Sequence, residues 1–211
     1  MLIKRASIND EKIRKILYNQ PSMTEEPKEN LIGEKLRNLS ITELSKATNN
    51  FLSLLKNHNP EYFPSAANKE GLVLIARRYS EEYSPLLREW ERRQNDPNYQ
   101  KEPYQDLRGQ MPDILLQEMR QLEEKQNYSL DWNPAVEGKR LLLLEKVYNS
   151  YKESETKIPY PWLEFFLQNK EEINKILKDL GRKQSREGLN EEERLISNFL
   201  TESGVEKILK D

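Results

Sequence analysis

Hydrophobic residues recur every three to four positions along most of the chain, while the strict alternation that predicts strands is nearly absent. The pattern is clearest over residues 41–55 and 134–151, where one helix face would carry the large apolar side chains. Leu72–Ile75 alone would suit a strand, but the helical spacing continues through Tyr79. We therefore predict an all-α protein, a helical bundle of about eight to ten helices.

Capping residues and prolines mark the predicted helix boundaries. Three pairs match the capping box of helix N-termini: Ser40 with Glu43, Asn169 with Glu172, and Asn190 with Glu193. Further starts are predicted at Ser84 as N-cap with Pro85 behind it, at Pro112, at Asn133-Pro134, and between Pro159 and Pro161. The helix after Asn169 is expected to end at Gly181, and the one after Asn190 at Ser203-Gly204.

The loop over residues 95–111, which holds two prolines and a glycine, divides the prediction into two parts. Residues 1–95 form an N-terminal helical part and residues 112–211 a C-terminal one, with a single compact domain as the alternative. An amphipathic helix is expected before Pro21, and residues 1–20 hold five basic and two acidic residues, a net charge of +3. A proline-containing acidic linker over residues 21–29 follows.

Composition narrows the classes of function. Of the 211 residues 33% are charged and 36% hydrophobic, which suits thin helices with wide solvated faces, or a subunit that completes its burial against partners. The absence of cysteine excludes zinc fingers, iron–sulfur clusters and cysteine nucleophiles. No apolar run approaches the length of about 20 residues that a bilayer span needs, so we expect a cytoplasmic protein without a signal peptide or membrane contact.

No set of residues in the sequence predicts catalysis. The only histidine, His58, lies at a predicted helix C-terminus, where a capping role is expected. Pro112-Asp113 and Glu123-Glu124-Lys125 resemble a nuclease pattern, but ten residues of helix separate them by roughly 15 Å, too far to share a metal ion. The acids Glu191–Glu193 fit the first turn of a helix, and no glycine-rich phosphate loop is present. We expect no enzyme activity, no metal and no cofactor.

Clusters of basic residues are the sequence's main candidates for binding. Seven are candidates for contact with nucleic-acid phosphates: Arg77, Arg78, Arg88, Arg92, Arg93, Lys139 and Arg140. Tyr79, Tyr83 and Trp90 lie among the arginines and could stack on bases. The alternative is a solvated, salt-bridged helix face, because Glu81, Glu82, Glu89 and Glu91 alternate with the same arginines.

With these basic helices and no catalytic motif, the chain resembles the small helical subunits of multi-subunit CRISPR effector complexes. The resemblance implies a role in antiviral defence, in which copies line the complex and contact the backbone of RNA or single-stranded DNA without cutting it. It also implies other protein subunits as partners. Under this hypothesis the seven basic residues above would hold the phosphates.

A protein-only adaptor or regulator is the alternative function. Residues 134–154 and 189–209 are predicted amphipathic helices that could present apolar seams to partner helices. Whether Leu141, Leu144, Tyr148 and Tyr151 are all buried within the monomer would decide the first of these seams. The stripe Trp162–Phe166 is expected to be core, with a docking patch as the alternative.

Overall fold

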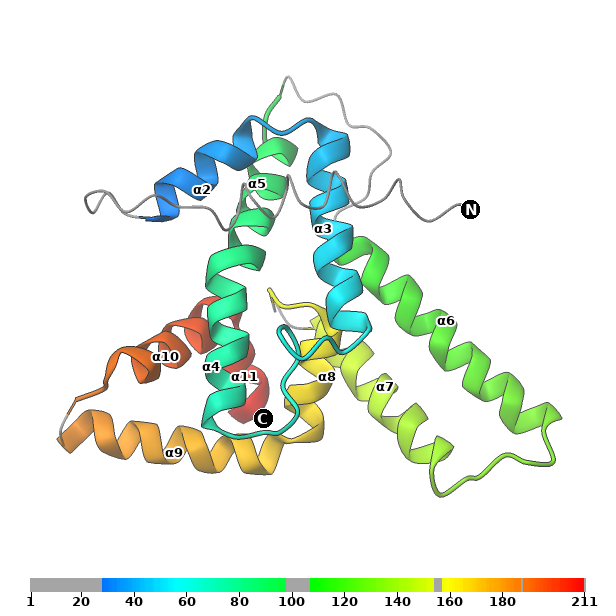
Figure 1. The fold of residues 1–211 in the computed structure, drawn as a ribbon. Coiled ribbons are helices and arrows are strands. Elements are labelled where there is room, and N and C mark those ends of the chain that lie inside the picture. The colour runs from blue at the N-terminus through cyan, green and yellow to red at the C-terminus, as the bar shows by residue number, and fades with distance from the viewer. Residues whose placement is uncertain (1–27, 98–106, 154–156, 187, 211) are drawn as a thin grey trace, which may run out of the picture. The chain divides into compact units, whose positions relative to one another are not determined.

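A computed structural model describes residues 28–97, 107–153, 157–186 and 188–210 (Figure 1). The predicted all-α class is confirmed: within these ranges the chain forms helices and no strand. The helices are α2 (Lys28–Arg37), α3 (Ile41–Lys56), α4 (Lys69–Arg78), a π-helical turn η1 (Tyr79–Tyr83), α5 (Ser84–Gln94), α6 (Leu107–Tyr128), α7 (Glu137–Glu153), α8 (Tyr160–Gln168), α9 (Lys170–Arg186), α10 (Glu191–Ser203) and α11 (Val205–Lys210). The amphipathic helix predicted before Pro21 and most of the predicted loop over residues 95–111 lie outside the described residues.

The chain divides into two compact units by its contacts. Unit 1 holds α2, α3 up to Ser53, and α5, while unit 2 holds residues 54–80 and everything described from α6 onward. The chain crosses between the units after Ser53 and after Ser80, both inside the predicted N-terminal part, because residues 54–80 pack with the C-terminal helices. The third crossing falls in the predicted loop over residues 95–111.

Unit 1 has a small core in which an aromatic contact joins α3 to the end of η1 and polar contacts join α3 to α5. Phe51 stacks on Tyr83 with ring centroids 5.4 Å apart. The indole N–H of Trp90 donates to the Thr48 hydroxyl at 3.0 Å, and that hydroxyl donates to the Leu44 carbonyl at 2.9 Å. Burial thus leaves neither polar side chain without a partner, as a stable interior requires.

Unit 2 has the larger aromatic core. All members of the Trp162–Phe166 stripe that were expected to be core are buried, which confirms that prediction: Trp162, Leu163, Phe165 and Phe166. Phe199 of α10 lies beside Tyr79 and Phe166, with centroid distances of 5.0 Å and 5.8 Å. The Trp162 indole donates to the Tyr62 carbonyl at 3.1 Å, tying α8 to the loop before α4.

A buried carboxylate joins three helices of unit 2. Glu193 of α10 accepts hydrogen bonds from Lys69 of α4 and Lys183 of α9, each at 2.8 Å, and completes the predicted capping box with Asn190. Hydrogen bonds from Lys183, then Lys69 and the Asn190 backbone, lower the pKa of Glu193 to about 2. The carboxylate is therefore charged at neutral pH and fixes the α9–α10 connection.

Several boundary predictions are confirmed. Ser40 and Glu43 form the reciprocal capping box of α3. Pro159 is the N-cap of α8, and α10 ends at Ser203 before Gly204, whose φ is 76°. His58 lies where α3 ends, and its φ of 49° is a left-handed conformation that glycine usually takes at this position. The N–H groups of His58 and Asn59 both donate back to carbonyls in the last turn of α3, which forms a Schellman motif.

Other boundary predictions were wrong for physical reasons. Ser84 is not an N-cap: α5 follows η1 directly, because the wide π turn accommodates Pro85, which has no N–H to donate into a regular ladder. Helix α6 begins at Leu107, so Pro112 lies in its second turn. Helix α9 continues past Gly181 to Arg186, because Asp179–Arg182 and Lys183–Glu193 pairs favour further turns. Helix α2 begins at Lys28, so its first residues overlap the predicted linker over residues 21–29.

Candidate functional site

The seven predicted phosphate contacts lie on three helices. Arg88, Arg92 and Arg93 lie on α5 in unit 1, whereas Arg77 and Arg78 lie on α4 and Lys139 and Arg140 on α7 in unit 2. The structure thus brings the three α5 arginines together on one element. Whether each can contact a phosphate depends on what its guanidinium already binds.

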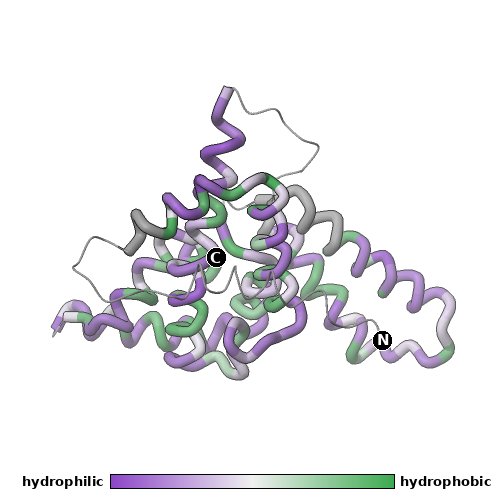
Figure 2. Tube along the Cα trace, turned by 45° about the horizontal axis from the view of Figure 1, so that its top comes forward, coloured by the Kyte–Doolittle hydropathy of each residue, from purple (hydrophilic) through white to green (hydrophobic). Residues whose placement is uncertain are grey.

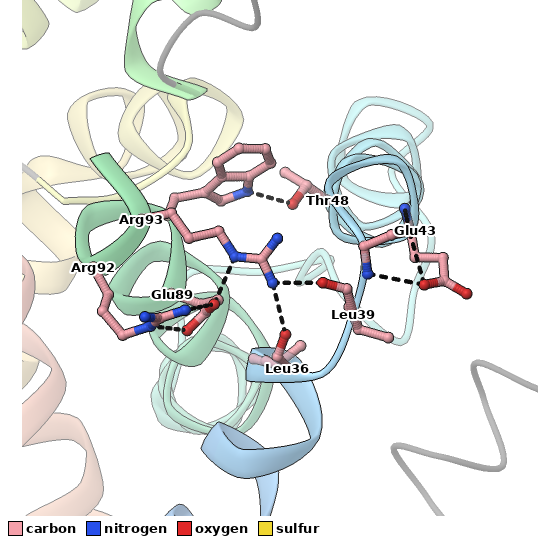
Figure 3. Close-up of polar contacts among 9 residues, drawn as sticks. Leu36, Leu39, Glu43, Thr48, Glu89, Arg92 and Arg93 are labelled. Atoms are coloured by element: carbon pink, nitrogen blue, oxygen red, sulfur yellow. Dashed lines mark hydrogen bonds and ion pairs between the residues drawn. The ribbon is translucent and has the colours of Figure 1, made fainter. Parts of the chain in front are cut away.

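Arg93 is a buried structural residue, with its side chain only 8% exposed (Figure 3). Its Nε donates to Oε1 of Glu89 at 2.7 Å, and its Nη2 donates to the carbonyls of Leu36 and Leu39 at 3.1 Å and 2.7 Å. These carbonyls are at the C-terminus of α2, where backbone acceptors lack intrahelical donors. Arg93 therefore completes the end of α2 and holds it against α5.

Glu89 is shared between Arg93 and its neighbour Arg92. Arg92 donates from Nε and Nη2 to the two carboxylate oxygens at 2.9 Å and 2.8 Å. Burial raises the pKa of the Glu89 carboxyl, but the hydrogen bonds from Arg92 and Arg93 outweigh it and hold the pKa below its ordinary value. Arg88 donates to the Ser84 hydroxyl at 3.1–3.2 Å. The salt-bridged interpretation of this helix accounts for Glu89, Arg92 and Arg93.

Arg78 and Arg140 are also held by groups of the protein. Arg78 donates to the Glu61 carbonyl at 2.9 Å and lies over the Tyr62 ring, 4.5 Å from its centroid. Arg140 pairs with Glu164 of α8 and with Glu118 of α6, the latter at 2.7 Å. Burial lowers the pKa of Arg140, but the charges of Glu164 and Glu118 outweigh it and raise the pKa overall. Arg140 is the residue that joins the α6–α7 hairpin to α8.

Two of the seven, Arg77 and Lys139, are exposed, and no bond of their side chains is seen within the described residues. The three aromatic residues predicted to stack on bases are all buried: Tyr79 and Tyr83 at 2% exposure and Trp90 at 4%. These residues therefore offer no aromatic platform, and five of the seven predicted contacts already bind groups of the protein.

The two predicted partner-binding seams differ in how far their apolar side chains are buried. In the seam over residues 189–209 the large apolar residues Ile196, Phe199 and Leu200 are buried in unit 2, so they are core. In the seam over residues 134–154, Leu144 is buried, Leu141 and Tyr148 are half-buried, and the side chain of Tyr151 lies outside the described part. Leu142 on the same helix is 59% exposed. Among the described residues, the seam over residues 134–154 is the one that contains mostly exposed large apolar side chains, Val136 and Leu142.

That surface continues into the turn of the α6–α7 hairpin, which the sequence prediction missed. We call residues 123–137 the hairpin tip. Across the described residues, the large hydrophobic side chains that are mostly exposed all lie between the end of α6 and the second turn of α7: Tyr128, Leu130, Val136 and Leu142. Leu130 is fully exposed and Tyr128 is 87% exposed. Figure 2 shows hydrophilic positions along most of α6 and hydrophobic ones in and after the turn.

Local hydrogen bonds hold the tip in this conformation. The Ser129 hydroxyl accepts from the Asp131 N–H at 3.2 Å, and the Asn133 side-chain oxygen accepts from the Ala135 N–H at 3.0 Å. The Ser129 N–H also donates to the Lys125 carbonyl at 2.9 Å, continuing the last turn of α6. Because side chains of Ser and Asn stabilise such turns, the tip displays Leu130 from an ordered backbone.

The tip also contains two buried polar atoms without a partner. The indole nitrogen of Trp132 and one carboxylate oxygen of Glu137 are both shielded from solvent, and neither makes a hydrogen bond within the described structure. Unpaired buried donors and acceptors are uncommon in native proteins and cost free energy. The tip thus combines exposed apolar area with two shielded polar atoms that have no partner within the described residues.

A sequence signal for this site existed. Leu130 and Trp132 alternate with Ser129, Asp131 and Asn133, residues that form turns and leave no helix face on which an apolar side chain could be buried. Large apolar residues inside a turn-forming segment indicate either a buried loop or a contact surface.

Other chemistry is limited within the described ranges. No group of three or more His, Asp or Glu side chains there is placed to hold a metal ion. Among the same residues, none of the helices combines the length and apolar character that a bilayer crossing requires. Comparison of the chain with protein-family models, with curated proteins and with solved structures found no match.

Proposed function

We propose that this protein is a non-catalytic helical interaction module that binds a partner protein through the hairpin tip. The observation that carries the proposal is the gathering of all four mostly exposed large hydrophobic side chains of the described chain in one turn and the helix after it. Single exposed apolar residues are ordinary on protein surfaces, but a cluster on one ordered turn is typical of a contact site.

The chemistry of the tip suits an apolar protein surface better than a nucleic acid. Tyr128 and Leu130 supply apolar contact area, and an aromatic residue beside aliphatic ones is typical of interface centres. The charged residues of the tip are Glu123, Glu124, Lys125, Asp131 and Glu137, four acids against one base. Exposed Arg120 and Lys139 lie just outside the tip, so the charge around it is mixed, and the apolar side chains are what favour a protein partner.

The test is affinity capture with the full-length chain from lysate of its own cells, together with photocrosslinking from position 130. Leu130→Asp should lose the captured partner at least tenfold, because a charge would be buried without compensation at the centre of the contact. Leu130 is fully exposed, so this variant should fold like the native chain.

The matched control is Asn198→Asp on α10, which adds the same charge at another exposed position. It should retain the partner. Equal capture by the native chain and Leu130→Asp would refute the proposal, as would loss of every captured protein after nuclease treatment, the result expected of the CRISPR effector subunits that the chain resembles.

A further inference from the structure

We propose that residues 175–186, the C-terminal part of α9, form a strap that opens away from unit 2 while the rest of the unit stays folded, with the Lys183–Glu193 ion pair as its latch. The strap is a different segment of unit 2 from the hairpin tip, so it stands or falls independently of the proposed function. Burial along α9, its hydrogen bonds to other helices and the remaining partners of Glu193 each support the strap.

Complete burial in α9 is confined to one residue near its start. Ile173, Ile176, Leu177 and Leu180 have the i, i+3, i+4, i+7 spacing of one helix face. Ile173 is fully buried, whereas the other three, which all belong to the strap, are half-buried. Figure 1 shows α9 running away from α8 along one edge of unit 2. Few buried apolar contacts favour local opening, and the three strap residues would then share one exposed face, at a spacing with which helices bind apolar grooves.

Side-chain hydrogen bonds from α9 to other helices follow the same division. Before the strap, Lys170 and Asn174 each donate to a backbone carbonyl of α11, at 3.2 Å and 3.1 Å. In the strap, the one such bond to another helix within the described ranges runs from Lys183 to Glu193 of α10, at 2.8 Å. The N-terminal part of α9 is therefore anchored at several points, and the strap is held by one ion pair.

Release of the strap leaves Glu193 with other partners. Its Oε1 also accepts a hydrogen bond from Lys69 of α4 at 2.8 Å, and its Oε2 accepts one from the Asn190 N–H at 3.0 Å. The Lys183 side chain is already 39% exposed, so its ammonium group returns to water readily. Opening thus breaks one charged hydrogen bond without leaving a buried carboxylate unpaired, which is the outcome that would make it costly.

Hydrogen exchange of the full-length chain at neutral pH, measured by mass spectrometry, tests the latch with two matched variants. Lys183→Met removes the latch, and Lys69→Met removes the other lysine that binds the same carboxylate oxygen at the same distance of 2.8 Å. Lys183→Met should speed the exchange of amides 177–182 about tenfold and change that of the α8 amides far less, because a hydrogen bond to a charged group contributes at least that factor to a local opening. Lys69→Met should leave the strap amides within about twofold of the native rate.

The native chain provides a test that needs no variant. Exchange of amides 177–182 should depend less on urea concentration than exchange of the α8 amides, because a local opening exposes little surface. Equal urea dependence would show that the strap opens only when the whole unit unfolds, and would overturn the proposal. So would faster exchange in Lys183→Met that is confined to residues 183–186, which is ordinary fraying of a helix end. An equal effect of the two variants on the strap, or no effect of Lys183→Met, would show that the ion pair is not the latch and would overturn the proposal too.

Discussion

At the scale of single residues, Arg93 shows how an exposed-looking basic cluster can be structural. In the sequence it belongs to a charged run with Arg88 and Arg92, and that run predicts a solvated or phosphate-binding face. In the structure its guanidinium donates to Glu89 and to two carbonyls more than fifty residues earlier in the chain. Its neighbour Arg92 binds the same carboxylate from the solvent side, with 46% of its side chain exposed. The two arginines therefore form a matched pair that differs mainly in burial.

Substituting each of the two with methionine, which keeps much of the apolar stem, should have unequal effects on stability. Arg93→Met should lower the free energy of unfolding by about 3 kcal/mol, because it leaves two buried carbonyls and part of a buried carboxylate without their donor. Arg92→Met should cost less than about 1 kcal/mol, since an exposed ion pair contributes little. Urea unfolding followed by circular dichroism measures both, and equal losses would contradict the structural role of Arg93.

At the scale of elements, the start of α4 depends on a glycine. Gly71 is buried in the first turn, where its N–H donates to the Asn68 side chain at 2.8 Å. A Cβ at this position would lie 2.4 Å from the Ala66 carbonyl oxygen and 2.9 Å from the Pro64 Cβ. By contrast, a Cβ on Gly181, in the interior of α9, would meet no atom within 4 Å.

Substitution of glycine by alanine should therefore change the stability of the protein in opposite directions at these two positions. Gly181→Ala should stabilise the protein by about 0.5–1 kcal/mol, because alanine loses less backbone entropy than glycine in a helix. Gly71→Ala should destabilise it by about 1–3 kcal/mol, because relief of the overlap requires the loop before α4 to move. Thermal unfolding measures the Tm of both variants. A rise in Tm for Gly71→Ala would contradict the prediction and show that the loop before α4 moves away without cost.

Local signals in the sequence predicted elements well wherever a few neighbouring residues decide the structure. The capping boxes at Ser40 and Asn190 were found because each needs only a residue and its third neighbour. The wrong boundaries at Ser84 and Gly181 came from the same local rules, overridden by contacts that the sequence does not display. The carbonyl partners of Arg93 and the carboxylate partners of Arg140 are non-local in the chain, so the sequence could not show these contacts. The Glu89 partner of Arg93 is only four residues away and belongs to the salt-bridged alternative that the sequence did offer. The hairpin tip was missed for a different reason: Leu130 and Trp132 lie in a turn-forming segment, outside the helical pattern from which apolar residues were assigned to a core or a seam.

At the scale of the whole molecule, formal charge overstates the positive charge available to a polyanion. The chain carries 34 basic and 36 acidic residues, and a phosphate-binding face would have to arise from local clustering. Five of the seven predicted contacts already lie against acceptors of the protein: Arg78, Arg88, Arg92, Arg93 and Arg140. Releasing such a guanidinium would leave a carbonyl, hydroxyl or carboxylate of the protein without its donor, so the cost of a contact with a phosphate would offset part of the gain.

The difference between occupied and unoccupied basic residues predicts how the affinity of the chain for a single-stranded nucleic acid depends on salt concentration. Each phosphate contact contributes about 0.7 to the slope of log K against log salt concentration, so seven contacts would give about 5 and two would give about 1.4. Arg77→Gln with Lys139→Gln removes two free charges and should flatten the slope by about 1.4, whereas Arg78→Gln with Arg92→Gln removes two occupied ones and should leave it unchanged. Fluorescence anisotropy of a labelled single strand between about 50 and 200 mM salt compares the two double variants, which lose the same formal charge. Equal flattening by both would mean that the occupied arginines leave their partners to bind phosphate, which would favour a nucleoprotein role over the protein-binding role of the hairpin tip.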